Sequence, residues 1–202
     1  MIVIAGAGGL AKEIAEVIDL TVGPVAGYLD DAEVPPELNN LGSCDLTNVP
    51  PHRSVIIGFG DPATRYRIAK RLRGARFTSV VHPTAVISPT AQVGAGVFIA
   101  AYAYIGADAV IGDHAVVNVR ATIGHDAQVG CFAVLSPHAN LNGAAVVGDG
   151  TFLGTAAAVS VGVEVGPWSK VAAASVVMRN APGGMLLAGS PATGRAMFRE
   201  PS

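Results

Sequence analysis

His125 and Asp126 are adjacent in the segment Ile123-Gly124-His125-Asp126. An imidazole that a carboxylate orients can accept a proton near neutral pH, which is the chemistry of a general base. An isolated His-Asp pair, however, is by default two polar residues on an outer surface. The pair therefore indicates catalysis only if the surrounding elements place it in a site.

A second candidate site is the glycine-rich segment Gly6-Ala7-Gly8-Gly9-Leu10-Ala11, which matches the pattern G-x-G-x-x-A. It follows the apolar run Ile2 to Ala5 and precedes a helical pattern through Leu20. A strand, a glycine turn and a helix in this order cradle phosphate groups, and the amino terminus of the helix offers free N–H groups. The context makes this fingerprint stronger than a glycine pattern alone.

The rest of the first 80 residues extends this unit. A second strand, Val25 to Leu29, is expected to deliver Asp30 and Asp31 where they can hydrogen-bond a ribose or sugar hydroxyl. A third strand, Val55 to Gly58, and a helix from Pro62 through Arg73 follow, after a long loop over 32–54. Because some 80 residues supply half of a doubly wound fold, we expect a nucleotide-linked ligand and not NAD.

Residues 81 to 181 repeat one pattern every six residues. Polar residues such as Asp113 and Asp149 stand where an ordinary strand needs apolar side chains, and a six-residue repeat drifts around a helix. A hexapeptide β-helix fits, in which each repeat is one short strand and three repeats close a triangular coil. A small residue, mostly Ala, follows four positions after the aliphatic residues that fill the prism, which are Val81, Ile87, Val93, Ile99, Ile105, Ile111, Val117, Ile123, Val129, Leu135, Leu141, Val147, Leu153, Val159, Val165, Val171 and Val177.

The period predicts which residues stack. Residues 18 apart lie on adjacent coils, at the usual strand spacing of about 4.8 Å, so Gly143 is expected directly next to His125. A glycine there leaves room for a thioester, and its N–H can stabilise an oxyanion. Asn118 and Ser136 stack in the same way on a neighbouring face.

The histidines of the repeat fall on different faces. By the same count His82 and His138 share one face, His114 lies on a second and His125 on a third, so one chain cannot gather them around a metal. We expect no metal, although a site shared across subunits, as in hexapeptide-repeat carbonic anhydrases, remains an alternative. His114 and His138 are expected to be solvated or hydrogen-bonded surface residues.

Composition narrows the class of protein. Half of the 202 residues are hydrophobic and 14% are charged, which suggests that partner subunits bury the outer faces. A net charge of −2 without a basic run argues against nucleic acid. Cys44 and Cys131 fall in different expected domains, which favours a reducing cytoplasm. The start of the chain does not resemble a signal peptide, and no stretch is long enough to span a membrane, so we expect a soluble protein.

Five segments together resemble the bacterial sugar O- and N-acetyltransferases of the sialic acid O-acetyltransferase and UDP-4-amino-sugar N-acetyltransferase group. These segments are GAGGLAKEIAEVI, YLDD, GFGDPATR, IGHDAQVG and AGSPA. The resemblance implies an α/β half-Rossmann βαβ domain over 1–80 that binds the nucleotide sugar. It also implies a left-handed parallel β-helix with a C-terminal tail over 81–202, and the left hand rests on the resemblance alone because parallel crossovers are otherwise right-handed.

The resemblance also assigns roles to residues. It makes His125 the general base, oriented by Asp126, and places acetyl-CoA in the cleft between two prisms of a homotrimer, along Val134, Gly143, Thr155 and Ala173. The nucleotide sugar is expected to contact Gly8, Gly9, Leu10, Asp30, Asp31, Gly60 and Asn118. Some relatives have His in place of Leu10 or Val134, so the polar contacts of those histidines are absent here.

The function that these observations favour is transfer of an acetyl group from acetyl-CoA to the amine of a nucleotide-linked amino sugar, in the synthesis of a surface polysaccharide or glycan precursor. O-acetylation of sialic acid or a similar sugar uses the same base and remains an alternative. An NAD-binding regulatory or redox protein rests on the glycine fingerprint alone, and no hydride-transfer constellation accompanies it. A β-solenoid scaffold without chemistry is the last alternative.

Overall fold

The glycine turn at Gly6 directly follows the central strand, β1, of a five-stranded parallel sheet with the strand order β3-β2-β1-β4-β5. The computed structural model describes residues 1–197. The strands are β1 (Ile2–Ala5), β2 (Gly27–Leu29), β3 (Asn40–Gly42), β4 (Ser54–Ile57) and β5 (Arg76–Phe77). The three predicted strands are present, and the segment 32–54, expected as a loop, contains β3 and the short 3-10 helix η1 (Leu46–Asn48).

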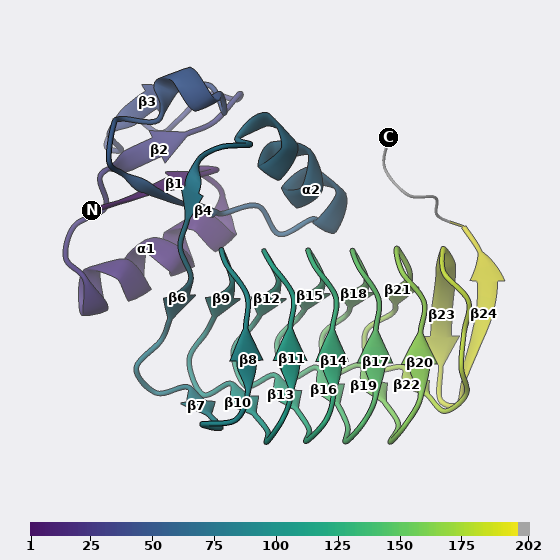
Figure 1. Cartoon of the computed structure of the whole chain (residues 1–202). Coiled ribbons are helices and arrows are strands. Elements are labelled where there is room, and N and C mark those ends of the chain that lie inside the picture. The colour runs from purple at the N-terminus through teal and green to yellow at the C-terminus, as the bar shows by residue number, and fades with distance from the viewer. Residues whose placement is uncertain (198–202) are drawn as a thin grey trace.

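Two helices accompany this sheet (Figure 1). Helix α1 (Gly9–Thr21) buries Ala11, Ile14, Val17 and Ile18 on one side, as their helical spacing predicts. Helix α2 (Pro62–Arg71) begins at Asp61, whose carboxylate accepts a hydrogen bond from the Thr64 N–H at 2.8 Å. Strand, helix and strand therefore alternate as the sequence indicates.

The predicted prism is present from β6 onward, and the registers pair each residue with the residue 18 positions later. Its coils are left-handed, as the family resemblance implied. The strands are two residues long: β6 (Val80–Val81), β7 (Val86–Ile87), β8 (Gln92–Val93), β9 (Phe98–Ile99), β10 (Tyr104–Ile105), β11 (Val110–Ile111), β12 (Val116–Val117), β13 (Thr122–Ile123), β14 (Gln128–Val129), β15 (Val134–Leu135), β16 (Asn140–Leu141), β17 (Val146–Val147), β18 (Phe152–Leu153), β19 (Ala158–Val159), β20 (Glu164–Val165), β21 (Lys170–Val171) and β22 (Val176–Val177).

Three sheets form the sides of the prism. The first face contains β6, β9, β12, β15, β18 and β21; the second face contains β7, β10, β13, β16, β19 and β22; and the third face contains β8, β11, β14, β17 and β20. Each face passes to the next at a corner, which we name by the two faces that it joins. Many corner residues have a left-handed backbone, such as His114 with φ +60° and Asp126 with φ +57°.

The second residue of each strand points inward. Ile105, Ile123 and Leu141 are 0% exposed, and the alanines of the corners, such as Ala127, are buried beside them. This arrangement confirms that the aliphatic positions fill the interior and that the small positions are needed where the chain turns.

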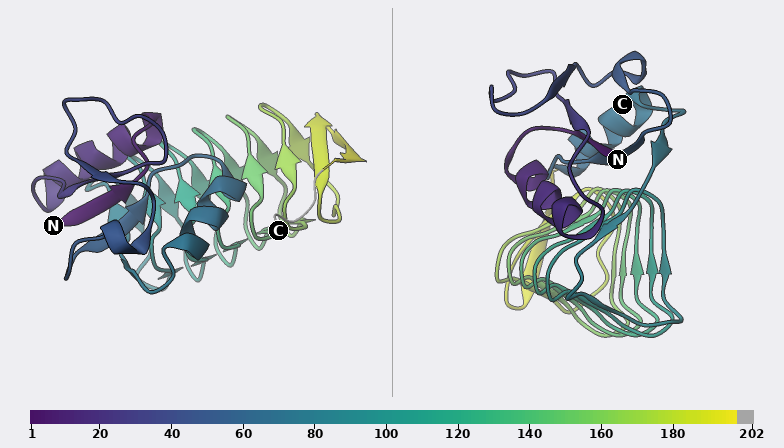
Figure 2. Two further views of the ribbon diagram at one scale, coloured as in Figure 1. Left: turned by 90° about the horizontal axis from the view of Figure 1, so that it is seen from above. Right: turned by 90° about the vertical axis from the view of Figure 1, so that its left-hand side faces the viewer.

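The N-terminal unit is seated on the first face of the prism (Figure 2). Outward-pointing Val80, Phe98, Val116 and Val134 from that face belong to one buried apolar cluster with residues of α1. The unit is therefore held in place by a continuous hydrophobic contact.

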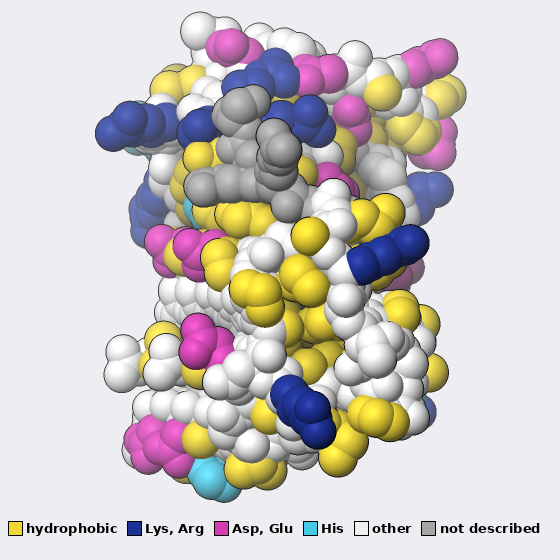
Figure 3. All heavy atoms as spheres, turned by 90° about the vertical axis from the view of Figure 1, so that its right-hand side faces the viewer, with side chains coloured by type: hydrophobic (Ala, Val, Ile, Leu, Met, Phe, Trp, Pro, Cys, Tyr) yellow, Lys and Arg dark blue, Asp and Glu magenta, His cyan; other side chains and the backbone are white. Residues whose placement is uncertain are grey.

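The end of the prism contains two more strands where a C-terminal tail was predicted. Strands β23 (Met185–Gly189) and β24 (Ala192–Ala196) form an antiparallel hairpin, and β23 extends the first face by pairing with β21. Seen from this end, apolar side chains are common on the prism and charged side chains gather on the N-terminal unit (Figure 3). Within residues 1–197 no helix has the length and apolar character needed to cross a membrane.

Candidate active site

His125 and Asp126 lie at the second–third corner, between β13 and β14. The imidazole Nδ1 is 2.7 Å from the Asp126 Oδ2, and the two side chains are 69% and 60% exposed. When Nδ1 carries the proton and donates to Asp126, Nε2 presents its lone pair to a ligand. The pair has the geometry that a carboxylate-oriented base requires.

Gly143 lies next to His125 on the following coil, as the period predicts. An ideal Cβ on Gly143 would be 2.6 Å from Nε2 of His125, so the imidazole itself occupies the space that the missing side chain leaves. The sequence predicts that this space is for a thioester, and the structure instead gives it to the ring. The Gly143 N–H donates to no acceptor in residues 1–197, which leaves it available to a ligand oxygen.

The glycine turn of the N-terminal unit combines one packed glycine with two open ones. Gly6 has φ +119° and approaches Gly58 and Phe59 closely. Gly8 and Gly9 have no neighbouring atom within 4 Å of an ideal Cβ, and Gly8 begins α1 without a side-chain cap. Packing within the chain therefore does not explain Gly8 and Gly9, whereas a phosphate against the free N–H groups of α1 would need both.

Gly60 follows β4 and is equally open, with nothing within 4 Å of an ideal Cβ. It lines a cavity of about 380 Å³ between the start of α2 and the outer surface of β18 and β21. Leu10 is half-buried and packs against the apolar cluster under α1. Gly60 therefore faces the cavity, whereas Leu10 packs against the apolar cluster and offers no polar group to a ligand.

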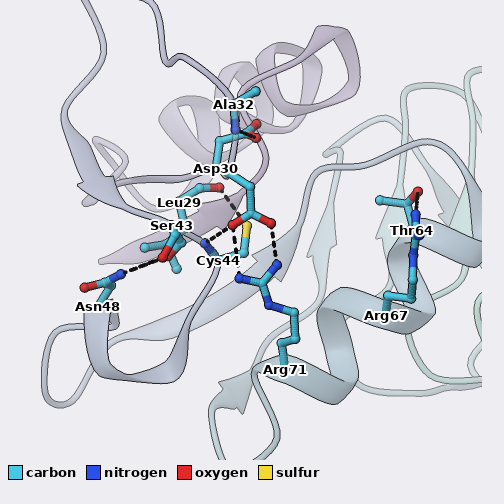
Figure 4. A network of polar contacts seen from close by, with 10 residues as sticks. Leu29, Asp30, Ala32, Ser43, Cys44, Asn48, Thr64, Arg67 and Arg71 are labelled. Carbon is cyan, nitrogen blue, oxygen red and sulfur yellow. Dashed lines mark hydrogen bonds and ion pairs between the residues drawn. The ribbon is translucent and has the colours of Figure 1, made fainter.

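Asp30 and Asp31 are both engaged within the protein (Figure 4). Asp30 accepts hydrogen bonds from the Ala7 N–H at 2.8 Å and the Ala32 N–H at 3.0 Å, so it fastens the glycine turn to the end of β2. Asp31 forms a two-pronged ion pair with Arg71, which lowers the pKa of its carboxyl group. Both carboxylates keep lone pairs for a hydroxyl group, but each already holds part of the unit together.

The remaining predicted residues are not gathered around His125 in one chain. Thr155 and Ala173 are exposed and stack at the first–second corner. Asn118 is half-buried at the same corner and accepts from the Val119 N–H through its own side chain. Val134 is 4% exposed and lies in the cluster on the first face.

The prediction that His114 is a surface residue is wrong. Its side chain is 8% exposed at the third–first corner, stacked on Phe132 with 5.1 Å between ring centroids and edge-on to Phe77 at 4.4 Å. Its Nδ1 has no hydrogen-bond partner among the described residues. Burial, with a smaller contribution from the charge of Arg65, lowers the pKa of His114 to about 4. His138, in contrast, is exposed.

In the part of the chain that the structure describes, no three His, Cys, Asp or Glu side chains converge on a possible metal site. Cys44 and Cys131 are both free thiols. Burial raises the pKa of the Cys44 thiol to about 12 and also raises that of Cys131. Neither thiol is a ready nucleophile at neutral pH.

Comparison with known proteins supports the two-part organisation. Residues 1–72 match the family model described as PglD N-terminal domain, and residues 90–125 match that of the bacterial transferase hexapeptide, six repeats. The structure superposes on PerB of Caulobacter crescentus, solved in complex with CoA and GDP-perosamine, with 32% identity, coverage of 96% of both chains and a TM-score of 0.91. The chain belongs to the hexapeptide-repeat sugar acetyltransferase family.

Other solved structures have the same fold. The acetyltransferase domain of PglB from Neisseria gonorrhoeae, solved with acetyl coenzyme A, is 29% identical over 96% of this chain and 98% of that chain, with a TM-score of 0.88. WeeI from Acinetobacter baumannii has the same TM-score at 21% identity and shows the fold alone. A search of curated protein sequences gave no match.

Reasoning from the sequence missed two parts of the region around Gly60. Trp168 and Lys170 line the cavity beside Gly60, and Arg65 is buried between the two units. A signal for Trp168 was available, because His114, Phe132, Gly150 and Trp168 stand 18 residues apart at the third–first corner. No comparable signal distinguished Arg65 from the other basic residues of α2.

Proposed function

We propose that this chain is an acetyl-CoA-dependent N-acetyltransferase that acts on the amine of a nucleotide-linked amino sugar, for a surface polysaccharide or glycan precursor. The observation that carries the proposal is the exposed His125–Asp126 pair, whose imidazole packs against Gly143, a residue whose N–H has no acceptor among residues 1–197. It occurs in a chain that is 32% identical throughout to an enzyme solved with CoA and GDP-perosamine.

The reaction is a direct transfer with His125 as the base. The amine nitrogen attacks the thioester carbon while Nε2 of His125 accepts the amine proton, and Asp126 stabilises the imidazolium that forms. The Gly143 N–H donates to the oxyanion of the tetrahedral intermediate. The C–S bond then breaks, and the proton on His125 passes to the departing thiolate of coenzyme A.

A covalent acetyl-enzyme is unnecessary in this scheme. The raised pKa values of Cys44 and Cys131 argue against a thiolate nucleophile at neutral pH. A bound amine is itself a sufficient nucleophile once its proton can leave.

We infer that residues 1–80 form the nucleotide-sugar domain and that residues 81–202 form the acetyltransferase domain. The open glycines Gly8, Gly9 and Gly60 support an acceptor site at the carboxyl edge of the N-terminal sheet, since an ideal Cβ at each would have no protein atom within 4 Å. Ligands of open parallel sheets bind at this edge. Leu10, Asp30 and Asp31 border the same glycine turn, and Asn118 remains a proposed contact of the sugar.

We further propose that the protein is a homotrimer whose sites lie between chains. The N-terminal unit is seated on the first face, while His125 is at the second–third corner, which is the corner opposite that face in a triangular prism. An acceptor on this unit therefore has to reach the His125 of a second chain. Exposed apolar side chains on the second and third faces support association: Val86 is 58% exposed, Tyr104 49% and Val110 38%.

Acetyl-CoA is placed in the cleft between two prisms, with Gly143 at the thioester. Thr155 and Ala173 are exposed at a corner and are available to the coenzyme. Val134 is buried under the N-terminal unit, so its proposed part in coenzyme binding is confined to shaping the neighbouring surface. The cytoplasm is the proposed location. Both cysteines are free thiols in the structure, as is usual in a reducing compartment, and the proposed donor is acetyl-CoA.

The test is an acetylation assay with purified protein, acetyl-CoA and a panel of acceptors, followed by release of the coenzyme A thiol and by mass spectrometry of the sugar product. We expect turnover with GDP- or UDP-linked amino sugars and none with the corresponding hydroxy sugars. Turnover with sialic acid alone would replace this proposal by sugar O-acetylation.

A further inference from the structure

Arg65 is a fully buried cation with no carboxylate partner. Its side chain is 0% exposed, and no ion pair to it exists among residues 1–197. The guanidinium is satisfied by backbone carbonyls alone. A buried charge costs free energy unless it is hydrogen-bonded, so the hydrogen bonds of Arg65 to these carbonyls are needed for its burial.

The carbonyls that Arg65 contacts belong to both units of the molecule. One nitrogen, Nη1, donates to the Ile57 and Phe59 carbonyls at 2.8 Å each, at the end of β4. Nε and Nη2 donate to the carbonyl of His114 at 2.9 and 2.7 Å, at the third–first corner of the prism. The planar guanidinium group of Arg65 thus joins the segment just before Gly60 to the prism.

Aromatic packing beside this fork holds α2 on the same corner. The ring of Tyr66 lies edge-on to Phe132 and to Trp168, with ring centroids 5.4 and 5.5 Å apart. Lys70 Nζ covers the Tyr66 ring at 4.6 Å from its centroid. The contact between α2 and the corner is therefore specific along its length.

Arg65 joins the segment that directly precedes one wall of the cavity at Gly60 to the corner that carries the other wall, at a point three coils before Trp168. One wall is Gly60, Asp61 and Pro62, directly after Phe59, and the other includes Phe152, Trp168 and Lys170 of the prism. Lys170 Nζ lies 5.0 Å from the centre of the Phe152 ring and has no ion-pair partner among the described residues. The hydrogen bonds of Arg65 hold the β4 end, which precedes the first wall, against the corner that carries the second wall.

We propose that Arg65 is a positioning residue for the acceptor. By fixing the separation of the two cavity walls, Arg65 fixes the distance between the bound nucleotide sugar and the first face of the prism. The inference rests on the proposed function, because it takes the cavity at Gly60 as part of the nucleotide-sugar site. Lysine at position 65 keeps the positive charge but carries its donors on a single nitrogen, so it cannot hold β4 and His114 in the same geometry.

The test compares Arg65→Lys with wild type in the full-length protein. Steady-state kinetics should show a KM for the nucleotide sugar raised about tenfold or more, with the KM for acetyl-CoA changed less than about twofold, since misplacement of a bound substrate is costly. Arg65→Gln, which also removes the charge, should give a larger effect in the same direction. Hydrogen exchange of the amides of residues 58–63 should become faster, while the His125 corner should keep its rate.

Two controls separate positioning from stability. Ile68→Val removes buried packing on the same helix and should lower Tm without moving either KM. Arg73→Lys, at an exposed position, should behave as wild type. If Arg65→Lys and Arg65→Gln lower Tm while the KM for the nucleotide sugar and the exchange of 58–63 stay unchanged, Arg65 is only structural. An inactive wild-type protein would refute the proposed function instead, and the exchange measurement would still decide whether Arg65 fixes the loop.

Discussion

The imidazole of His125 lies over the α-carbon of Gly143, where an ideal Cβ would be only 2.6 Å from Nε2. Two consequences follow from this contact. The base has a fixed neighbour on the next coil, and that neighbour, Gly143, carries the N–H that is proposed to donate to the oxyanion while His125 accepts the amine proton. Gly143 is required by this packing and not by its backbone angle, which is in a region open to other residues.

Gly143→Ala should therefore displace the His125 ring without unfolding the prism. We expect kcat to fall by about 10²-fold, because the base loses its alignment, with Tm nearly unchanged because the His125 side chain is 69% exposed. Kinetics and a thermal melt of the same preparation check this. A Gly143→Ala protein with wild-type kcat would show that the contact has no part in catalysis.

Gly9 allows the phosphate site to be tested without damage to the fold. The Cβ of an aspartate at this first position of α1 would have no protein atom within 4 Å. Its carboxylate would interact favourably with the helix dipole, yet it would repel a diphosphate. Gly9→Asp should keep or raise Tm while weakening nucleotide-sugar binding about tenfold or more, a loss of about 1.4 kcal/mol or more. Calorimetric titration measures this, with Gly9→Ala as the neutral control. Equal binding by Gly9→Asp and Gly9→Ala would exclude Gly9 from the phosphate site.

The lowered pKa of the buried His114 side chain predicts that the folded protein loses stability in mild acid. Its pKa is about 4 in the folded protein against 6.5 as the ordinary value, so the unfolded chain binds the extra proton first. Stability is then fully present above pH about 6.5 and falls as the pH drops toward 4, by about 2 kcal/mol between pH 7 and 5. Replacing His114 by Phe, the residue found one coil on at Phe132, should remove this part of the slope of Tm against pH.

The matched control for His114 is His138→Phe at an exposed corner, which should retain the wild-type slope. A His114→Phe protein whose Tm still falls with acid as steeply as wild type would mean that other groups cause the loss.

Sharing of the active site between chains predicts complementation. At a subsaturating nucleotide-sugar concentration, His125→Ala and Gly9→Asp should each keep at most about a tenth of wild-type activity. Mixed trimers refolded from equal amounts should regain about a quarter of it, because some interfaces pair an intact base with an intact acceptor site. Light scattering should give three times the chain mass of 20.3 kDa. A monomeric mass, or no activity in the mixture, would contradict an interchain site.

The prism could be predicted from the sequence because its period is local and complete. Ile123 and Leu141 recur in step with every other aliphatic position, so the coil, the corner and the adjacency of His125 and Gly143 all follow from counting. The first strand and α1 could be predicted in the same way from Ile2–Ala5 and the spacing of Ile14, Val17 and Ile18.

What the sequence did not reveal depends on contacts between the two units. His114 was expected at the surface because its place in the repeat is an outer corner. Phe77 of β5 and Arg65 of α2 pack against that corner, and this contact between the units buries the ring. Arg65 looked like one of several basic residues on a helix, and its burial depends on carbonyls far along the chain. Val134 is covered for the same reason, since the repeat fixes the direction of a side chain but not what packs over it.

In the proposed mechanism His125 takes the acceptor proton, and the most direct test is kcat of His125→Ala at neutral pH with saturating acetyl-CoA and nucleotide amino sugar. We expect kcat to fall by roughly 10²–10⁴-fold, the usual worth of positioned proton transfer, with acetyl-CoA affinity nearly unchanged. Asp126→Asn should cost less, because Asp126 orients the ring and supports its charge. Near-wild-type turnover of His125→Ala with every acceptor that the native protein uses would contradict the account and leave His125 and Asp126 as a polar pair on a corner of the prism.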